Sequence, residues 1–167
     1  MPQGDAVLPI LNAWIQRALV EGWPIALTRD WHPAQHCSFQ ARGGPWPPHC
    51  VAATPGAQFH PQLLMPAGAR VFSKGSDPER EAYSGFEGIS ETGQRLGDWL
   101  HKQGVDRLYV GGLATDYCVR ATVLDALTAG FAVSVLRRGV RGVNAHPGDA
   151  DAAISHMQAQ GAQFIDG

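Results

Sequence analysis

The sequence predicts an α/β fold, with a doubly wound, mostly parallel sheet and helices on both of its faces. Three observations support this class. Short apolar runs alternate with amphipathic segments, and reactive side chains follow several of the apolar runs. The composition, 44% hydrophobic and 17% charged, is typical of a globular chain. At 167 residues, we expect one domain that spans residues 1–167.

The first half of the chain contains a helix, two strands, a long loop and a second helix. Residues 8–21 repeat apolar side chains at helical spacing, with Pro9 in the first turn and Gly22 at the end. Residues 24–29 are predicted as a buried strand. Residues 30–68 are rich in Pro, Gly, His and Trp, and a loop of this length is usually functional. Residues 70–73 are predicted as a strand and residues 90–103 as a helix.

The second half alternates more regularly. Residues 107–110 are predicted as a strand, followed by a helix that carries Cys118 and runs to about residue 128. A strand at 131–136, a helix at 149–160 and a closing strand at 163–165 follow. This alternation favours parallel pairing. The chain opens with a helix, whereas a doubly wound domain usually begins with a strand.

Charge and cysteine content exclude several classes of partner. A net charge of −2 gives no reason to expect nucleic acid or an anionic membrane surface. Three cysteines are too few and odd in number for a disulfide framework, and no 18-residue apolar run exists. We therefore expect a cytoplasmic protein in a reducing compartment.

A candidate metal site follows the strand at 24–29. Asp30 and His32 are two residues apart, so in an extended segment both project to one side. His49 can complete a set of two imidazoles and one carboxylate, which leaves coordination positions open, as a catalytic site requires. His36 is a candidate fourth ligand or supporting group, and His60 is a weaker one.

Two other readings of this segment stay open at this point. The histidines could be solvated or capping groups in a polar loop. A Cys/His zinc site could use Cys37 and Cys50, although their spacing lacks a paired C-x-x-C arrangement.

Cys118 is the candidate nucleophile. It lies where an apolar run gives way to a helix, and unpaired N–H groups and the helix dipole at that end lower the pKa of a thiol. Lys74 ends another strand. Because parallel strands end at one edge of a sheet, Asp30, Lys74 and Cys118 should share a crevice there. The alternatives are a small buried hydrophobe for Cys118 and a surface charge for Lys74.

Several motifs carry a family resemblance that covers nearly the whole chain. The sequence resembles the nicotinamidase/pyrazinamidase branch of the isochorismatase-like cysteine hydrolase superfamily in TRDWHPAQHCSF, GGPWPPHCV, GAQFHPQL, VFSKG, AYSGFEG, GGLATDYCVRATVLDAL and RGVNAHPGDADAAISHM. The resemblance implies hydrolysis of nicotinamide to nicotinate and ammonia, within NAD salvage. It also implies one divalent metal ion (zinc, iron or manganese) that binds the pyridine nitrogen and water.

The resemblance implies roles for individual residues. Cys118 corresponds to the nucleophile, which forms a thioester, and Lys74 to the catalytic lysine. The metal ligands correspond to Asp30, His32 and His49. The Leu113–Ala114 bond corresponds to a cis peptide that helps to shape an oxyanion hole. The substrate pocket corresponds to Trp46, Tyr83 and, at a variable position, Tyr117.

One family segment has no counterpart in this sequence. Members carry a V-D-x-Q-x-D-F type strand whose aspartate takes the proton of the cysteine, and Asp5 does not match that motif. The resemblance therefore implies that the first central strand is missing, with a gap of roughly 10 Å between its neighbours. A truncated or misassigned start, a strand from a partner chain, or a repurposed relative would each explain this.

As written, the chain is expected to have weak or no amidase activity and poor stability. The alternatives are a catalytically inactive relative that binds metal and a pyridine, and a metal-independent cysteine hydrolase of the same fold. A homo-oligomer is a further candidate state.

Overall fold

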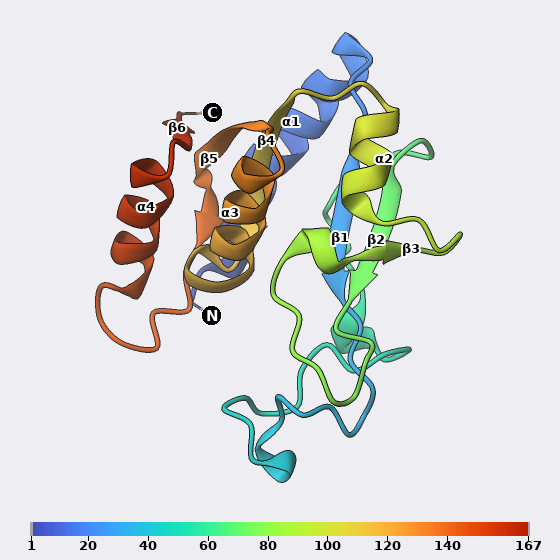
Figure 1. Ribbon diagram of the computed structural model, residues 1–167, viewed down its shortest axis with the longest axis vertical. Coiled ribbons are helices and arrows are strands. Elements are labelled where there is room, and N and C mark those ends of the chain that lie inside the picture. The colour runs from blue at the N-terminus through green and yellow to red at the C-terminus, as the bar shows by residue number, and fades with distance from the viewer. Residues whose placement is uncertain (1, 167) are drawn as a thin grey trace.

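The strands form two three-stranded sheets in a computed structural model that describes residues 2–166 (Figure 1). In the first sheet, with order β1-β2-β3, β1 and β2 are parallel and β3 is antiparallel to β2. In the second, with order β4-β5-β6, all strands are parallel. The bounds are β1 Ala26–Asp30, β2 Arg70–Lys74, β3 Ile89–Ser90, β4 Arg107–Leu113, β5 Ala132–Arg141 and β6 Gln163–Ile165.

The α/β class and the mostly parallel pairing are confirmed, but the strands are not joined into one sheet. Within the described residues, no strand pairing links β1 to β4, so each of these strands leaves one edge open. Thr28 in the middle of β1 is exposed, and in β4 every second residue is exposed. That a central strand is missing remains a prediction.

Four α-helices cover the sheets: α1 Leu8–Glu21, α2 Leu96–Lys102, α3 Arg120–Thr128 and α4 Asp149–Ala159. The prediction for α1 is confirmed, and Gly22 ends that helix with a left-handed backbone. Glycines let α1 approach the second sheet closely, because a Cβ on Gly111 would lie 2.6 Å from the Leu11 side chain. Figure 1 shows α3 on the opposite face of this sheet.

The two sheets share one hydrophobic core. Phe72 of β2 is fully buried, and its ring lies 5.6 Å from that of Trp99 in α2. Each fully buried side chain of this size contributes roughly 1.5–3 kcal/mol. Side chains from α2, α3, α4, β2 and β5 meet here, among them Phe72, Leu96, Trp99, Leu100, Val119, Val123, Val133, Val135 and Met157.

Some predicted bounds were wrong. The helix predicted over residues 90–103 begins only at Leu96, because Ser90 belongs to β3 and its hydroxyl accepts a hydrogen bond from the Gln94 N–H at 3.1 Å. This side-chain bond and Gly93, at φ 80°, favour a tight turn over a helix. The strand predicted at 131–136 extends to Arg141.

The long segment between β1 and β2 extends from the carboxyl end of β1 (Figure 1). It contains short 3₁₀ turns at Gln40–Arg42 and Pro55–Ala57; others lie at Gly4–Val7 and Gly85–Glu87. A bridge between His32 and Val51 folds the segment back over the strand end. Among the helices described, none has the length and apolar character to cross a lipid bilayer.

Candidate active site

The structure brings Cys118 and Lys74 together. Cys118 lies on a π-helical turn, Thr115–Val119, that directly follows β4 and precedes α3. The Leu113–Ala114 peptide bond before this turn is cis, as the resemblance implied. Lys74 is the last residue of β2, and its Nζ lies 3.4 Å from the Cys118 Sγ. The two strand ends therefore meet at one site.

Lys74 also connects the thiol to a carboxylate. Its buried ammonium donates to the Asp30 Oδ1 and to the Ala82 carbonyl oxygen, the latter at 3.0 Å. Burial alone would lower the pKa of Lys74, but the negative charges that Cys118 and Asp30 carry when they are ionised outweigh burial and raise it. Lys74 is therefore a cation at neutral pH.

The predicted lowering of the Cys118 pKa was wrong for this structure. Burial raises the pKa of the Cys118 thiol above its ordinary value, and the nearby Lys74 ammonium offsets this only in part. The Asp30 carboxylate adds to the increase. A π-helical turn also replaces the expected first turn of an α-helix around this residue. The thiol is thus mostly protonated at neutral pH.

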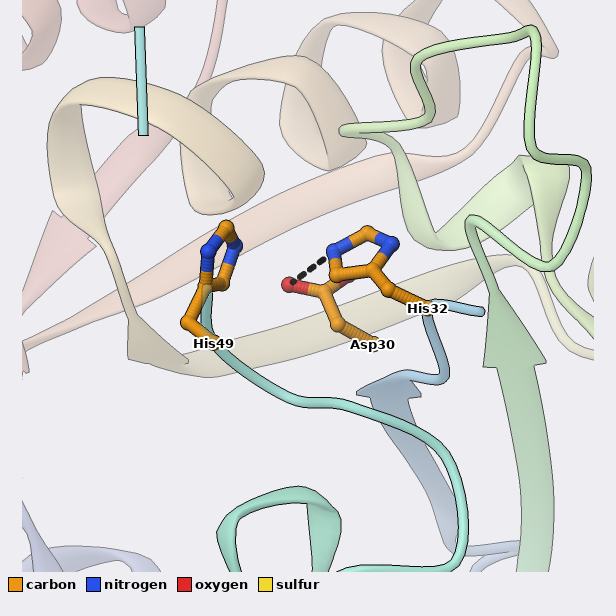
Figure 2. A group of neighbouring side chains, drawn as sticks. All are labelled: Asp30, His32 and His49. Carbon is orange, nitrogen blue, oxygen red and sulfur yellow. Dashed lines mark ion pairs between the residues drawn. The ribbon is translucent and has the colours of Figure 1, made fainter. Parts of the chain in front are cut away.

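The predicted metal ligands Asp30, His32 and His49 form one group (Figure 2). One donor atom from each lies within 4.8 Å of the others, and the Asp30 Oδ2 is 3.9 Å from the His32 Nε2. The His32 Nδ1 contacts the Gly75 carbonyl oxygen, and the His49 Nδ1 contacts the Pro47 carbonyl oxygen, both at 2.9 Å. A carbonyl oxygen can only accept a hydrogen bond, so the Nδ1 of each imidazole carries a proton. The Nε2 lone pairs are left for a ligand, as at a metal centre.

Backbone geometry and burial support this group. The His32 N–H donates to the Cys50 carbonyl at 3.0 Å and the Ala52 N–H to the His32 carbonyl at 2.7 Å, which fixes His49 beside His32. Cys50 has a left-handed φ of 45°. Burial lowers the pKa of His32, which keeps its imidazole neutral, as metal coordination requires. The donor set and its protonation fit a divalent cation.

His36 lies behind this group rather than in it. Its ring centroid is 4.3 Å from that of His32, while its Nδ1 contacts the Ser38 hydroxyl at 2.7 Å and its Nε2 the Arg80 carbonyl at 3.0 Å. His36, Cys37 and Glu81 also bring donor atoms within 4.8 Å of one another. Because both imidazole nitrogens of His36 already have protein partners, this geometry favours a supporting role.

The other candidates of the long loop do not join the group. His60 is exposed and its Nδ1 accepts from the Gln62 N–H at 3.2 Å. Cys37 and Cys50 are both free thiols, and no donor cluster in the described part of the chain combines them. Burial raises the pKa of Cys50 to about 11. Asp5 lies in the exposed turn before α1, outside the site, as expected.

Two of the three predicted pocket residues line a cavity beside the metal-binding group, and Tyr117 packs against both of them. Trp46 and Tyr83 line it together with Asp30, His32 and His49. The Trp46 Nε1 donates to the Tyr83 hydroxyl at 3.2 Å, and the Tyr117 ring lies 4.9 Å from that of Trp46. Burial raises the pKa of Tyr83 to about 12, so its phenol stays neutral. These aromatic side chains pack together into one wall of the cavity.

Three supporting residues were not found from the sequence. The buried Asp116 accepts hydrogen bonds from the N–H groups of Val143 and Asn144, at 2.9 and 2.7 Å. Thr122 contacts backbone groups on both sides of the site, and Gly75 packs against the His32 ring. Their partners are distant in sequence, so no local pattern reveals them.

Comparison with known proteins agrees with this geometry. An isochorismatase domain model matches residues 1–167. A nicotinamidase of Escherichia coli K12 is 41% identical over 97% of this chain and 84% of its own length. A nicotinamidase/pyrazinamidase of Mycobacterium tuberculosis is 43% identical over 84% of this chain and 75% of its own. The crystal structure of a pyrazinamidase of Pyrococcus horikoshii in complex with zinc superposes with a TM-score of 0.91, at 45% identity, over 100% of this chain and 88% of that one.

Proposed function

The chain belongs to the isochorismatase domain family, and from this membership we propose that it is a metal-dependent amidohydrolase that converts nicotinamide to nicotinate and ammonia. Relatives named nicotinamidase support the choice of substrate. The observation that carries the proposal is the position of Lys74, which contacts both the Cys118 thiol and the Asp30 carboxylate. Lys74 thereby links a nucleophile to a metal-binding group beside an aromatic pocket.

Asp30, His32 and His49 would hold one divalent cation, since their donor atoms converge and both imidazoles present a free Nε2. Zinc is the first candidate because it accepts this mixed set and accompanies the Pyrococcus relative, with iron and manganese as alternatives. Such an ion would orient and polarise the bound heteroaromatic substrate. Trp46 and Tyr83 would pack against the ring and exclude water.

Cys118 would supply the covalent chemistry. Its thiolate attacks the carboxamide carbon, a C–S bond forms, and the carbonyl electron pair moves to oxygen, where backbone N–H groups after the cis Leu113–Ala114 bond would stabilise the charge. The C–N bond then breaks, and the nitrogen takes up the proton that the thiol lost and leaves as ammonia. Water cleaves the thioester, which releases nicotinate and restores the thiol. The sum is one amide and one water converted to one acid and one ammonia.

The charge balance of the site predicts slow turnover. Lys74 is the side-chain hydrogen-bond partner of the sulfur among the described residues, and a protonated lysine cannot accept the thiol proton. Because burial also raises the pKa of Cys118, little thiolate forms at neutral pH. We expect a kcat below about 1 s⁻¹, at the lower end of the range for enzymes.

The test is ammonia release from nicotinamide by the purified chain with Zn²⁺, beside Cys118→Ala and the matched control Cys37→Ala. We expect slow turnover that Cys118→Ala abolishes and Cys37→Ala retains. Turnover that survives Cys118→Ala would contradict the proposal. Binding without turnover would indicate an inactive pyridine-binding relative, and turnover without bound transition metal a metal-independent hydrolase.

The proposed reaction would return the pyridine ring, as nicotinate, to NAD salvage. The three free thiols are compatible with the reducing conditions of the cytoplasm, which we propose as its location.

A further inference from the structure

We infer that Thr122 is a positioning residue that ties the aromatic wall of the pocket to the backbone of the nucleophile; this inference rests on the proposed function. The Thr122 hydroxyl donates to the Cys118 carbonyl oxygen at 2.6 Å and accepts from the Gly85 N–H at 2.8 Å. Gly85 is 37 residues away in the sequence. One side chain thus joins two segments of the site.

The segment that Thr122 holds carries Tyr83. We call residues 82–85 the pocket strap. Lys74 fixes one end of this strap, since its Nζ donates to the Ala82 carbonyl at 3.0 Å, and Thr122 fixes the other end at Gly85. Between these two points, the Tyr83 hydroxyl accepts from the Trp46 Nε1. The position of Tyr83 relative to Cys118 therefore depends on the two attachments.

Hydrogen bonds stiffen the pocket strap after Tyr83, so a displacement of Gly85 moves the residues of the strap together. The Ser84 hydroxyl accepts from the Phe86 N–H at 3.1 Å, and the Glu87 carboxylate accepts from the Ser84 N–H at 3.0 Å, which forms a capping box. Ser84 and Gly85 are both buried. Displacement would consequently be transmitted to Tyr83 rather than absorbed within the turn.

A threonine hydroxyl that donates to the carbonyl four residues earlier is common in helices and alone would indicate nothing. The Thr122 hydroxyl differs from such common cases because it also accepts a hydrogen bond from the Gly85 N–H. Gly85 approaches α3 closely, because a Cβ there would lie 3.3 Å from both the methyl group and the hydroxyl of Thr122. Without Thr122, the buried Gly85 N–H would lose its acceptor, which is costly away from water.

Loss of the Thr122 hydroxyl should weaken substrate binding more than it slows the chemical step. Cys118 is also held by the backbone bonds of its turn, including those that Tyr117 and Val119 donate to the Ala114 carbonyl. The pocket strap lies outside the α-helices, and the Thr122 hydroxyl holds its Gly85 end, so that end is released when the link is cut. Tyr83 lines the cavity in which the substrate ring would lie, and a displaced wall weakens binding in the ground state and the transition state alike.

The test compares Thr122→Val, which keeps the shape but removes the hydroxyl, with Thr122→Ser, which restores it. Thr128→Val is the matched control, because Thr128 is exposed at the end of the same helix. We expect Thr122→Val to raise the KM for nicotinamide about tenfold, the size of one lost hydrogen bond, with kcat changed less than about threefold. Thr122→Ser and Thr128→Val should retain the parent KM.

Hydrogen exchange separates failure of this inference from failure of the proposed function. In Thr122→Val, peptides that span residues 82–88 should exchange about tenfold faster, and Thr122→Ser should restore protection. If the parent chain shows no turnover, the function is refuted and exchange alone decides the role of Thr122. Unchanged exchange in Thr122→Val, or a Thr122→Ser variant as impaired as Thr122→Val, would overturn the inference.

Discussion

Replacing Gly75 by alanine should disturb the metal-binding group through a single added methyl. Gly75 has a φ of +67°, and a Cβ built there would press against the His32 Cε1 and lie 2.6 Å from its Nδ1. The Gly75 carbonyl also accepts the hydrogen bond that sets the protonation of that ring. The His32 ring cannot yield easily, because it is buried and lies against His36 and Phe39.

Gly22 provides a matched control for the magnitude. Its φ of +69° is nearly the same, but nothing lies within 4 Å of its Cβ position. Alanine in this backbone conformation costs about 1–2 kcal/mol at either site. At Gly75, overpacking should add about 1–3 kcal/mol, so the free energy of unfolding should fall by about 2–5 kcal/mol in total. The difference between the two variants isolates the contact with His32.

Urea unfolding of both variants, with and without Zn²⁺, measures these terms. A displaced His32 should weaken zinc affinity about 10–100-fold, as loss of a supporting contact typically does. The stabilisation by saturating zinc should then fall by about 1.4–2.8 kcal/mol in Gly75→Ala and remain unchanged in Gly22→Ala. Equal losses of stability in the two variants, with equal zinc responses, would refute the proposed packing of Gly75 on His32.

Four further predictions concern the site. His49→Ala should lower zinc affinity more than about 100-fold in calorimetric titration, whereas His60→Ala should not; equal effects would exclude His49 as a ligand. The alkylation rate of Cys118 by iodoacetamide should rise with pH to a midpoint above that of an ordinary cysteine thiol, because burial raises the pKa of Cys118. Lys74→Met removes the cation that favours the thiolate, so the midpoint should rise further and alkylation at pH 8 should slow; faster alkylation would contradict the assignment. Asp116→Ala leaves the N–H groups of Val143 and Asn144 without an acceptor, so urea unfolding should show a loss of about 2–4 kcal/mol, against less than about 0.5 for the exposed Asp125→Ala.

Elements with clear periodicity and clear ends could be predicted from the sequence. The helix at 8–21 and the strand at 163–165 match the structure because apolar spacing and terminal glycines define them locally. The turn after Ser90 could not be predicted, since it depends on a side-chain hydrogen bond and on pairing of β3 with β2. Local helical spacing around Leu96 therefore predicted too long a helix.

In the candidate site, too, some features could be predicted from the sequence and others depend on packing. The sequence predicted the proximity of Asp30, Lys74 and Cys118 from strand ends at one edge of a single sheet. The proximity is observed, but Cys118 follows a strand of the second sheet, and Lys74 contacts it from the first. The sequence did not predict that the pKa of Cys118 is raised rather than lowered. A helix end lowers the pKa of an exposed thiol, but the degree of burial at Cys118 is a property of packing that no local pattern contains.

The division of the strands into two sheets has a consequence for how ligands act on this molecule. Asp30 and Lys74 end strands of one sheet, while Cys118 follows a strand of the other, and no ladder of backbone bonds in the described residues spans β1 and β4. The distance between sulfur and ammonium is thus governed by side-chain contacts and the shared core. A molecule bound across the pocket would contact residues of both sheets and hold them at a fixed separation. Its binding would therefore make the site more rigid.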